Sequence, residues 1–321
     1  MEHSRHRMSS LWKNQWFFLL IVILGISLIT AILNPRFLRI NNIINILQQV
    51  STLGVVAAGA TILIISGNFD ISAGANLGLS ACIMAMMIKS GVPSVLAVLT
   101  GLFVSMFCSF LVGAASIMFK APSFIISLAA AGIFKGISLA LTAAVLQNIY
   151  GQFEFLGATR FFGIVPLLFL VSLIVYFFVF ILLKYTLLGR RIYSIGSNPT
   201  AAYLSGINIK LNKLIFFMIS GGLIGLAATM MLSRIGAAQA STGSGIELTA
   251  IGAVVIGGTT MDGGKGGIVG TFFGVLLMGV IANSLNMLQV SPYLQGVING
   301  VVIVIAIAVS SLSQSDQKRV V

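Results

Sequence analysis

The chain has 321 residues, of which 58% are hydrophobic and only 7% are charged, and its mean hydropathy is +1.09. A soluble globular domain carries about 25% charged residues, so this composition excludes a soluble enzyme, a coiled coil and a disordered protein. A membrane-spanning helix takes about 20 residues, which leaves room for about ten spans and for no separate soluble domain. We therefore predict an all-α polytopic membrane protein with a single transmembrane domain over residues 1–321.

The apolar runs give the order of the spans. Residues 1–15 are polar and basic, and the run from Trp16 to Leu33 is longer than the roughly 7–15 residues of a signal-peptide core, so we expect an uncleaved first span. The predicted spans are about 16–33, 43–66, 71–88, 92–119, 122–146, 164–184, 213–232, 248–260, 268–290 and 293–312. The eighth of these, 248–260, is too short to cross a membrane as a straight helix.

The basic residues predict the orientation. With the N-terminus inside, 12 of the 18 Lys and Arg residues fall on the cytoplasmic side, 5 fall outside and Lys135 lies in a span. This excess favours both termini inside, because basic loops stay in the cytoplasm. The cytoplasmic segments are then 1–15, 184–213 and 313–321. The net charge of +12 is spread thinly between apolar runs, so we expect contact with membrane lipid and not with nucleic acid.

The cytoplasmic loop 184–213 contains a signal for one short helix. Asn198 can cap a helix whose first residue is Pro199, and Gly206 can end it. Two small alanines would allow close approach to a partner, and two aliphatic residues would supply anchors for a groove. The basic residues around this helix would lie near lipid headgroups or an acidic partner surface. The residues expected to dock are Asn198, Pro199, Ala201, Ala202, Leu204, Gly206 and Ile207.

Two glycine-rich segments match weakly. Residues 64–78 align with residues 256–270, and the match places Asp70 on Asp262. In each copy an acidic turn interrupts apolar sequence before a helix rich in small residues. This pattern favours two weakly repeated halves, which many transporters have.

Polar residues inside apolar runs mark a candidate translocation path. Amide side chains both donate and accept hydrogen bonds, which suits the hydroxyl groups of a sugar. The same amides could instead join helices to one another, and Asp70 could instead cap the helix that follows it. The candidate path residues are Asn45, Gln48, Gln49, Asn68, Asp70, Asn283 and Asn286.

Catalytic and metal-binding patterns are missing from the sequence. Both histidines lie in the N-terminal tail, and the two cysteines fall in separate apolar runs. The segment GGTTMDGGKGG fails as a phosphate-binding loop, because Thr259 occupies the first glycine position and Gly266 replaces the Ser or Thr after the lysine. We predict that the chain is not an enzyme and binds no cofactor or metal itself.

Four segments together resemble ribose-type membrane permeases of bacterial ABC sugar importers. The segments are NNIINILQQ (41–49), SGNFDISAG (66–74), LGRRIYSIGSNPTAAYLSGIN (188–208) and IELTAIGAVVIGGTTMDGGKGGIVGT (246–271). They follow the family order and cover nearly the whole chain. Asn68 and Ser197 stand where the family usually has glycine, which leaves the transported sugar open.

The resemblance implies a transport subunit of the bacterial inner membrane that imports a monosaccharide by alternating access. It implies a second permease copy, identical or related, and an extracytoplasmic sugar-binding protein. A separate ABC ATPase would bind ATP and magnesium and dock on the short cytoplasmic helix as its coupling helix. The alternative is a secondary sugar transporter that works without an ATPase, which the weak repeat and interrupted helices would also fit.

Overall fold

The computed structural model describes residues 15–291, 293–302 and 304. Within them the fold is almost entirely helical, which confirms the predicted class. The helices are α2 (Gln15–Leu33), the 3-10 helix η1 (Pro35–Leu38), α3 (Ile40–Ile65), α4 (Ala73–Lys89), α5 (Ser94–Met118), α6 (Ser123–Thr142), α7 (Phe155–Ala158), α8 (Leu167–Tyr185), α9 (Leu187–Ser197), α10 (Pro199–Leu204), α11 (Ile209–Ile235), α12 (Ile246–Ile256) and α13 (Ile268–Met287). Residues 293–302 are also helical.

Seven helices of the described chain are long and apolar enough to cross a membrane: α2, α3, α5, α6, α8, α11 and α13. Helices α4 and α12 are apolar but shorter, at 17 and 11 residues. Helix α12 corresponds to the eighth predicted span, and the prediction that this span is too short to cross a membrane as a straight helix is confirmed. Most of the tenth predicted span lies outside the described residues, so the count of ten and the inside position of the termini stay predictions.

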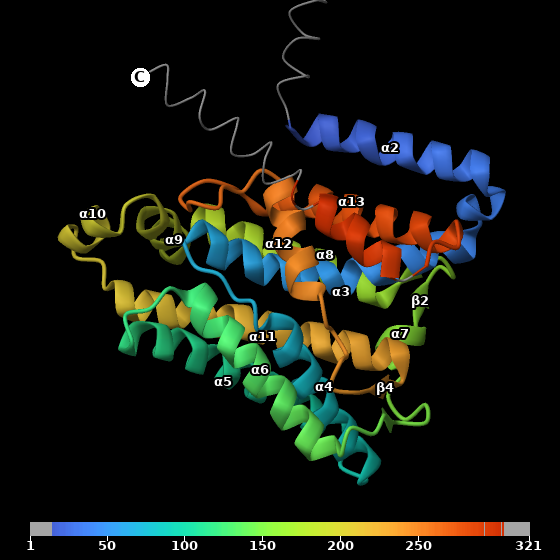
Figure 1. Ribbon diagram of the computed structural model, residues 1–321, viewed down its shortest axis with the longest axis horizontal. Coiled ribbons are helices and arrows are strands. Elements are labelled where there is room, and N and C mark those ends of the chain that lie inside the picture. Colours follow the sequence, from blue (N-terminus) through green and yellow to red (C-terminus); the bar gives the residue numbers. More distant parts are fainter. Residues whose placement is uncertain (1–14, 292, 303, 305–321) are drawn as a thin grey trace, which may run out of the picture.

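Two small antiparallel strand pairs lie at one end of the helix bundle. Strand β1 (Gln147–Asn148) pairs with β4 (Ala237–Ala238), and β2 (Arg160–Phe161) pairs with β3 (Val165–Pro166). We call this end, which also carries α7, the strand end. Helices α9 and α10 lie at the opposite end, which we call the α10 end (Figure 1).

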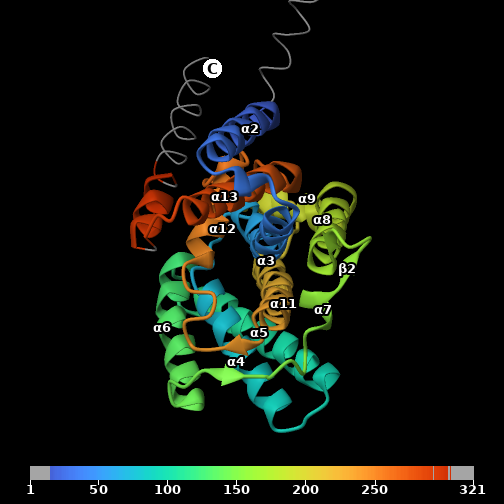
Figure 2. The ribbon, with the colours of Figure 1, turned by 90° about the vertical axis from the view of Figure 1, so that its right-hand side faces the viewer.

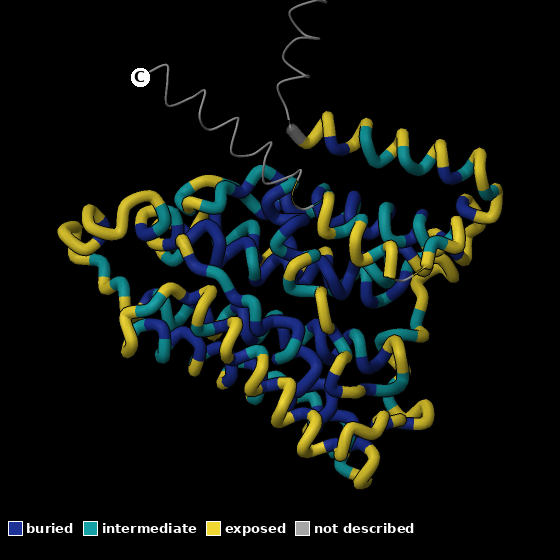
Figure 3. Tube along the Cα trace, viewed as in Figure 1, coloured by how far each residue is buried: buried dark blue, intermediate teal, exposed yellow. Residues whose placement is uncertain are grey.

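Helices α3 and α11 form the centre of the bundle. Helix α11 packs against both α3 and α5, and α4 packs against α5 and α6. Helices α2 and α13 lie on the other side of α3, which has α8 and α12 at its flanks (Figure 2). In α3, 83% of the residues of its membrane-spanning stretch are buried, whereas in α2 only 11% are. Helix α3 is therefore the core of the bundle and α2 lies at its periphery (Figure 3).

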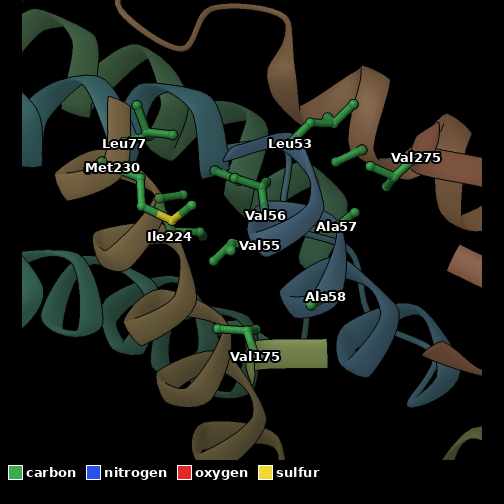
Figure 4. Close-up of a cluster of buried hydrophobic side chains, with 14 of the residues drawn as sticks. Leu53, Val55, Val56, Ala57, Ala58, Leu77, Val175, Ile224, Met230 and Val275 are labelled. Atoms are coloured by element: carbon green, nitrogen blue, oxygen red, sulfur yellow. The ribbon is translucent and has the colours of Figure 1, made fainter. Parts of the chain in front are cut away.

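Small side chains on α3 let other helices pack around it. Val55, Ala57 and Ala58 are fully buried, and Figure 4 shows them among side chains from α4, α8, α11 and α13. Outward-facing positions of the peripheral helices are instead large and apolar, as on α2, α5, α6 and α8. Such an exposed apolar surface is stable only in contact with lipid or another apolar surface.

Glycines bring neighbouring backbones close together. A Cβ atom at Gly78 of α4 would lie 2.6 Å from the carbonyl oxygen of Thr242. A Cβ atom at Gly274 of α13 would lie 2.0 Å from the carbonyl oxygen of Ala253 in α12. By contrast, a Cβ atom at Gly132 of α6 would meet nothing within 4 Å, so that glycine is not required by packing inside the chain.

The two interrupted regions share one plan. Helix α3 is followed by an extended segment, 66–72, and then by α4, while α11 is followed by segment 236–245 and then by α12. Helices α3 and α11 run in opposite directions, because the start of α3 and the end of α11 both contact α7: Gln48 Nε2 donates to the carbonyl of Gly157, whose N–H donates to Ser233 Oγ.

The predicted repeat aligns a different pair of segments. Residues 64–78 join α3 to α4, whereas residues 256–270 join α12 to α13. They lie against each other at the α10 end, where the N–H of Gly264 donates to the carbonyl of Ile65 at 2.8 Å. Helices α11 and α12 form a second unit with the order of α3 and α4, a long helix followed by a connecting segment and a shorter helix.

Candidate functional site: a polar cavity at the strand end

A cavity of about 810 Å³ lies between α3, α11, α13, residues 237–249 and residues 295–300. Small-molecule sites have about 300–1,000 Å³, so the cavity has room for a small polar solute and several waters. The segment between β4 and α12 forms much of its wall, with Gly243 and Gly245 at φ +87° and +84°. These left-handed positions favour glycine and shape the turn at the start of α12.

The wall of the cavity carries several amide and hydroxyl groups among apolar side chains. It includes Gln49, Thr52, Gln239 and Thr242, together with the guanidinium of Arg234. Groups of this kind match the hydroxyls of a sugar because each sugar hydroxyl can both donate and accept.

Two amides from the C-terminal part of the chain also line the wall, Gln295 and Asn299. Gln295 Nε2 donates to Asn286 Oδ1 at 3.0 Å. Asn299 Oδ1 is buried beside the cavity and accepts no hydrogen bond within the described residues. A buried oxygen without a partner is uncommon in native proteins, which marks this wall as a place where a solute or water would be bound.

Of the predicted path residues, Gln49 and Asn286 line the cavity. Gln48 lies elsewhere, because its amide holds the α7 carbonyl described above. Asn45 is exposed. Asn283 is buried and exchanges two hydrogen bonds of 2.9 Å with Asn42. It therefore joins two helices, which was the alternative to a place in the translocation path.

Asn68 and Asp70 lie in segment 66–72, away from the cavity wall. Asn68 Nδ2 donates to the carbonyl and hydroxyl of Ser66 at 3.1 Å, so it closes a local turn. Asp70 Oδ1 accepts from the N–H of Ser72 at 2.9 Å, just before α4 begins. This hydrogen bond closes a turn onto Ser72, the N-cap residue of α4, and α4 itself has no side-chain cap, so Asp70 does not cap the helix, which the sequence had allowed. Nor does Asp262 cap a helix, because it is exposed and α13 starts at Ile268 without a side-chain cap.

The short helix predicted in the cytoplasmic loop is present as α10. Asn198 Oδ1 accepts from the N–H of Ala201 at 3.0 Å, Pro199 occupies the first turn, and Gly206 takes φ +82° beyond the end. The predicted N-cap, first residue and stop are therefore confirmed.

Two of the residues expected to dock on a partner face inward instead. Ala202 is only 4% exposed, and Ile207 packs against the hydrophobic core. Helix α10 packs against α9 and α11. The two buried side chains therefore hold α10 to the bundle. Tyr203 and Leu204 are 69% and 79% exposed and form the apolar tip of α10.

Helix α9 was not predicted, and it links α10 to the interrupted helices. A Cβ atom at Gly196 would lie 1.8 Å from the carbonyl oxygen of Ile65 and 2.6 Å from the nitrogen of Gly264. Tyr193 Oη donates to the carbonyl of Gly266 at 2.9 Å, and burial raises the pKa of this phenol, which keeps it a donor at neutral pH. Helix α9 therefore joins α10 to the end of α3 and to the loop after α12.

Comparison with known proteins identifies the family. Residues 42–307 match the family model described as branched-chain amino acid transport system, permease component. The chain is 40% identical over 284 residues to the ribose import permease protein RbsC of Bacillus subtilis, covering 87% of this chain and 88% of that protein. The chain belongs to the ribose-type ABC permease family. No solved structure matches it.

Other relatives of the permease are named as transporters of different sugars. It is 37% identical over 302 residues to the D-allose transport system permease protein AlsC of Escherichia coli, covering 92% of this chain and 90% of that protein. It is 30% identical over 305 residues to the fructose import permease protein FrcC of Rhizobium meliloti, covering 91% and 83%. Members of the family are multi-pass inner-membrane transport subunits and not enzymes, which agrees with the seven apolar helices.

Proposed function

We propose that this permease forms the membrane path of an ATP-driven importer for a monosaccharide, with a ribose-like pentose as its first candidate. The observation that carries the proposal is the polar cavity at the strand end, in a chain whose relatives are named as ribose, allose and fructose permeases. The strand end would then face an extracytoplasmic sugar-binding protein, and the α10 end would face the cytoplasm.

The energy source would be a separate ATPase that binds ATP and magnesium and docks on α10. The exposed tip of Tyr203 and Leu204 suits an apolar groove. ATP-driven closure of the ATPase would move α10, and the close contact at Gly196 would pass that motion to α3 and to the loop after α12. A second permease, identical or related, would cover part of the exposed apolar surface.

Reconstitution tests this function. The permease, its ATPase and its sugar-binding protein would be placed in proteoliposomes, and uptake of radiolabelled ribose, allose and fructose would be measured. We expect uptake of at least one sugar that requires ATP hydrolysis and the binding protein. Uptake by the permease alone down a sugar gradient would support the alternative of a secondary transporter, which family membership does not favour.

A charge at the tip of α10 tests the docking. We expect Leu204→Glu to abolish ATPase co-purification and sugar uptake together, because burying an unpaired carboxylate in an apolar groove is costly. Thr200→Glu is the matched control, since Thr200 is also exposed on α10 but does not form the apolar tip. Normal uptake by the Leu204 variant would show that α10 is not the coupling helix.

A further inference from the structure

Two acidic side chains meet where the shorter helices α4 and α12 begin. Asp70 precedes α4, and Glu247 lies in the first turn of α12. Both line an interior void of about 10 Å³, whose other lining residues, apart from Ser220, are apolar. A void of this size has room for about one water molecule.

Each carboxyl has one oxygen that is hydrogen-bonded and one that is not. Asp70 is 8% exposed; its Oδ1 accepts from the N–H and the hydroxyl of Ser72, and its Oδ2 is buried without a partner. Glu247 Oε1 accepts from the N–H of Gly245 at 3.2 Å, and Oε2 is buried without a partner. Leaving two buried carboxylate oxygens unsatisfied is costly, so these two oxygens mark the void as a place where a ligand would be bound.

The positive partial charges around the void can offset one carboxylate charge. Glu247 is the charged neighbour of Asp70, and the other titratable group facing Asp70 is the Cys108 thiol of α5. No basic side chain of the described residues interacts with either carboxyl. The N-termini of α4 and α12 each supply a partial charge of about +0.5, which together offset one carboxylate but not two.

We propose that Asp70 and Glu247 form a proton-binding site that holds one proton between the two carboxyls, with one water in the void as the bridge. The proton comes from solvent water and forms an O–H bond to one of the two unpartnered oxygens. That carboxyl becomes a neutral donor, and the other stays negative. When the site opens, the O–H bond breaks and the proton returns to solvent. A sodium ion suits the void less well, because two helix N-termini would repel it.

The proton also holds α4 and α12 together. A Cβ atom at Gly74 would lie 2.0 Å from Glu247 Oε2, so the start of α4 lies directly against this carboxyl. Without the proton, two negative charges would face each other in apolar surroundings and would push the helix starts apart. The consequence for import, a clamp beside the cavity, rests on the proposed function, whereas the proton-binding site does not.

Infrared spectroscopy tests the site in the full-length permease reconstituted in lipid vesicles without other protein. The chain has only 6 Asp and Glu residues, and exposed carboxyls are ionised at about pH 7. We expect a carbonyl band from one protonated carboxyl at this pH, shifted in heavy water. Asp70→Asn and Glu247→Gln should each abolish the band, because the remaining carboxylate is offset by the helix N-termini. Glu154→Gln, at an exposed loop position, should keep it.

Three results would overturn the proposal. The first is the absence of the band in the unaltered protein at neutral pH. The second is a band that survives either single replacement, which would mean that burial alone protonates one residue without sharing. The third is a band that is absent in sodium chloride and appears when potassium replaces sodium, which would mean that the void holds a sodium ion.

The unaltered protein provides a measurement that needs no variant. A proton bound only in the folded state stabilises the protein below the pH at which the site loses it, and the stabilisation disappears as pH rises. We expect the melting temperature and the carboxyl band to fall together with rising pH. A band that titrates while the melting temperature stays constant would contradict a proton that joins the two helices.

Discussion

The α3–α4 and α11–α12 units share a plan, but their extended segments are held in different ways. In segment 66–72, the N–H groups of Phe69 and Ile71 donate to Ser123 and Ser127 of α6, each at 2.9 Å. In segment 239–247, the hydrogen bonds of the described chain join residues of that segment or the first turns of α12. The first segment is attached to a neighbouring helix, whereas the second is paired with β1 through the preceding Ala237 and Ala238 and is otherwise attached to itself.

This difference assigns the two units different roles. Segment 66–72 and α4 are held by α5 and α6, since Asn76 Nδ2 also donates to the carbonyl of Ser105 at 3.0 Å. Segment 239–247 forms the cavity wall, and the other end of α12 leads to the loop that contacts α9. We infer that α4 is the fixed side of the path and that the start of α12 is the side that moves.

The contact between the two units should be the most sensitive to substitution. In Gly74→Val even the Cβ atom would lie 2.0 Å from Glu247 Oε2 and 2.5 Å from the carbonyl oxygen of Gly243, before the rest of the side chain is counted. We expect a destabilisation of about 1–3 kcal/mol from overpacking and a loss of sugar uptake, measured by thermal unfolding and by vesicle transport. Gly132→Val is the control, because nothing lies within 4 Å of its Cβ position. Equal effects of the two changes would show that the contact is unimportant.

The attachment of segment 66–72 should have the next largest effect. Ser123→Ala and Ser127→Ala each leave a backbone N–H without its acceptor, which costs about 1–3 kcal/mol when the group is buried. Thermal unfolding would measure this loss. Ser172→Ala is the control, since its buried hydroxyl donates only to the carbonyl of Phe169 in its own helix. If all three variants unfold alike, the α6 attachment does not distinguish the two units.

The smallest effect should separate two adjacent amides. Gln49 lines the cavity, whereas Gln48 holds the carbonyl of Gly157. We expect Gln49→Leu to lower sugar uptake several-fold with little change in unfolding temperature, because it removes a hydrogen-bonding group from the wall. Gln48→Leu should lower stability by about 1 kcal/mol with uptake per folded molecule nearly unchanged. The reverse pattern would place the path on the other face of α3.

The sequence predicts the helices well because each is an apolar run with turn residues at its ends. Asn198, Pro199 and Gly206 similarly predict α10 from local backbone chemistry alone. What the sequence cannot show is which side of a helix faces the bundle. Ala202 and Ile207 were expected at a partner surface because their size suits one, but small and aliphatic residues suit the chain's own packing equally well.

The site was predicted only in part for a related reason. Gln48 and Gln49 have the same chemistry, and about 100° of rotation along α3 separates the one that binds α7 from the one that lines the cavity. Glu247 carried no signal in the sequence, because its importance comes from Asp70, which lies far away along the chain. The weak similarity between 64–78 and 256–270 also gives no sign that α11 and α12 share the order of α3 and α4, because that order is not encoded in matching residues.

Distances between spin labels test most directly whether the start of α12 moves against a fixed α4. Ser90→Cys and Ser244→Cys place labels at the exposed C-terminal end of α4 and in the cavity wall, while Ser90→Cys and Ala140→Cys place a control pair at that end of α4 and on α6. The native Cys82 and Cys108 are both buried. In the complex with its ATPase, we predict that ATP changes the first distance and leaves the second unchanged. Two unchanged distances, or two that change equally, would contradict a fixed α4 and a moving α12.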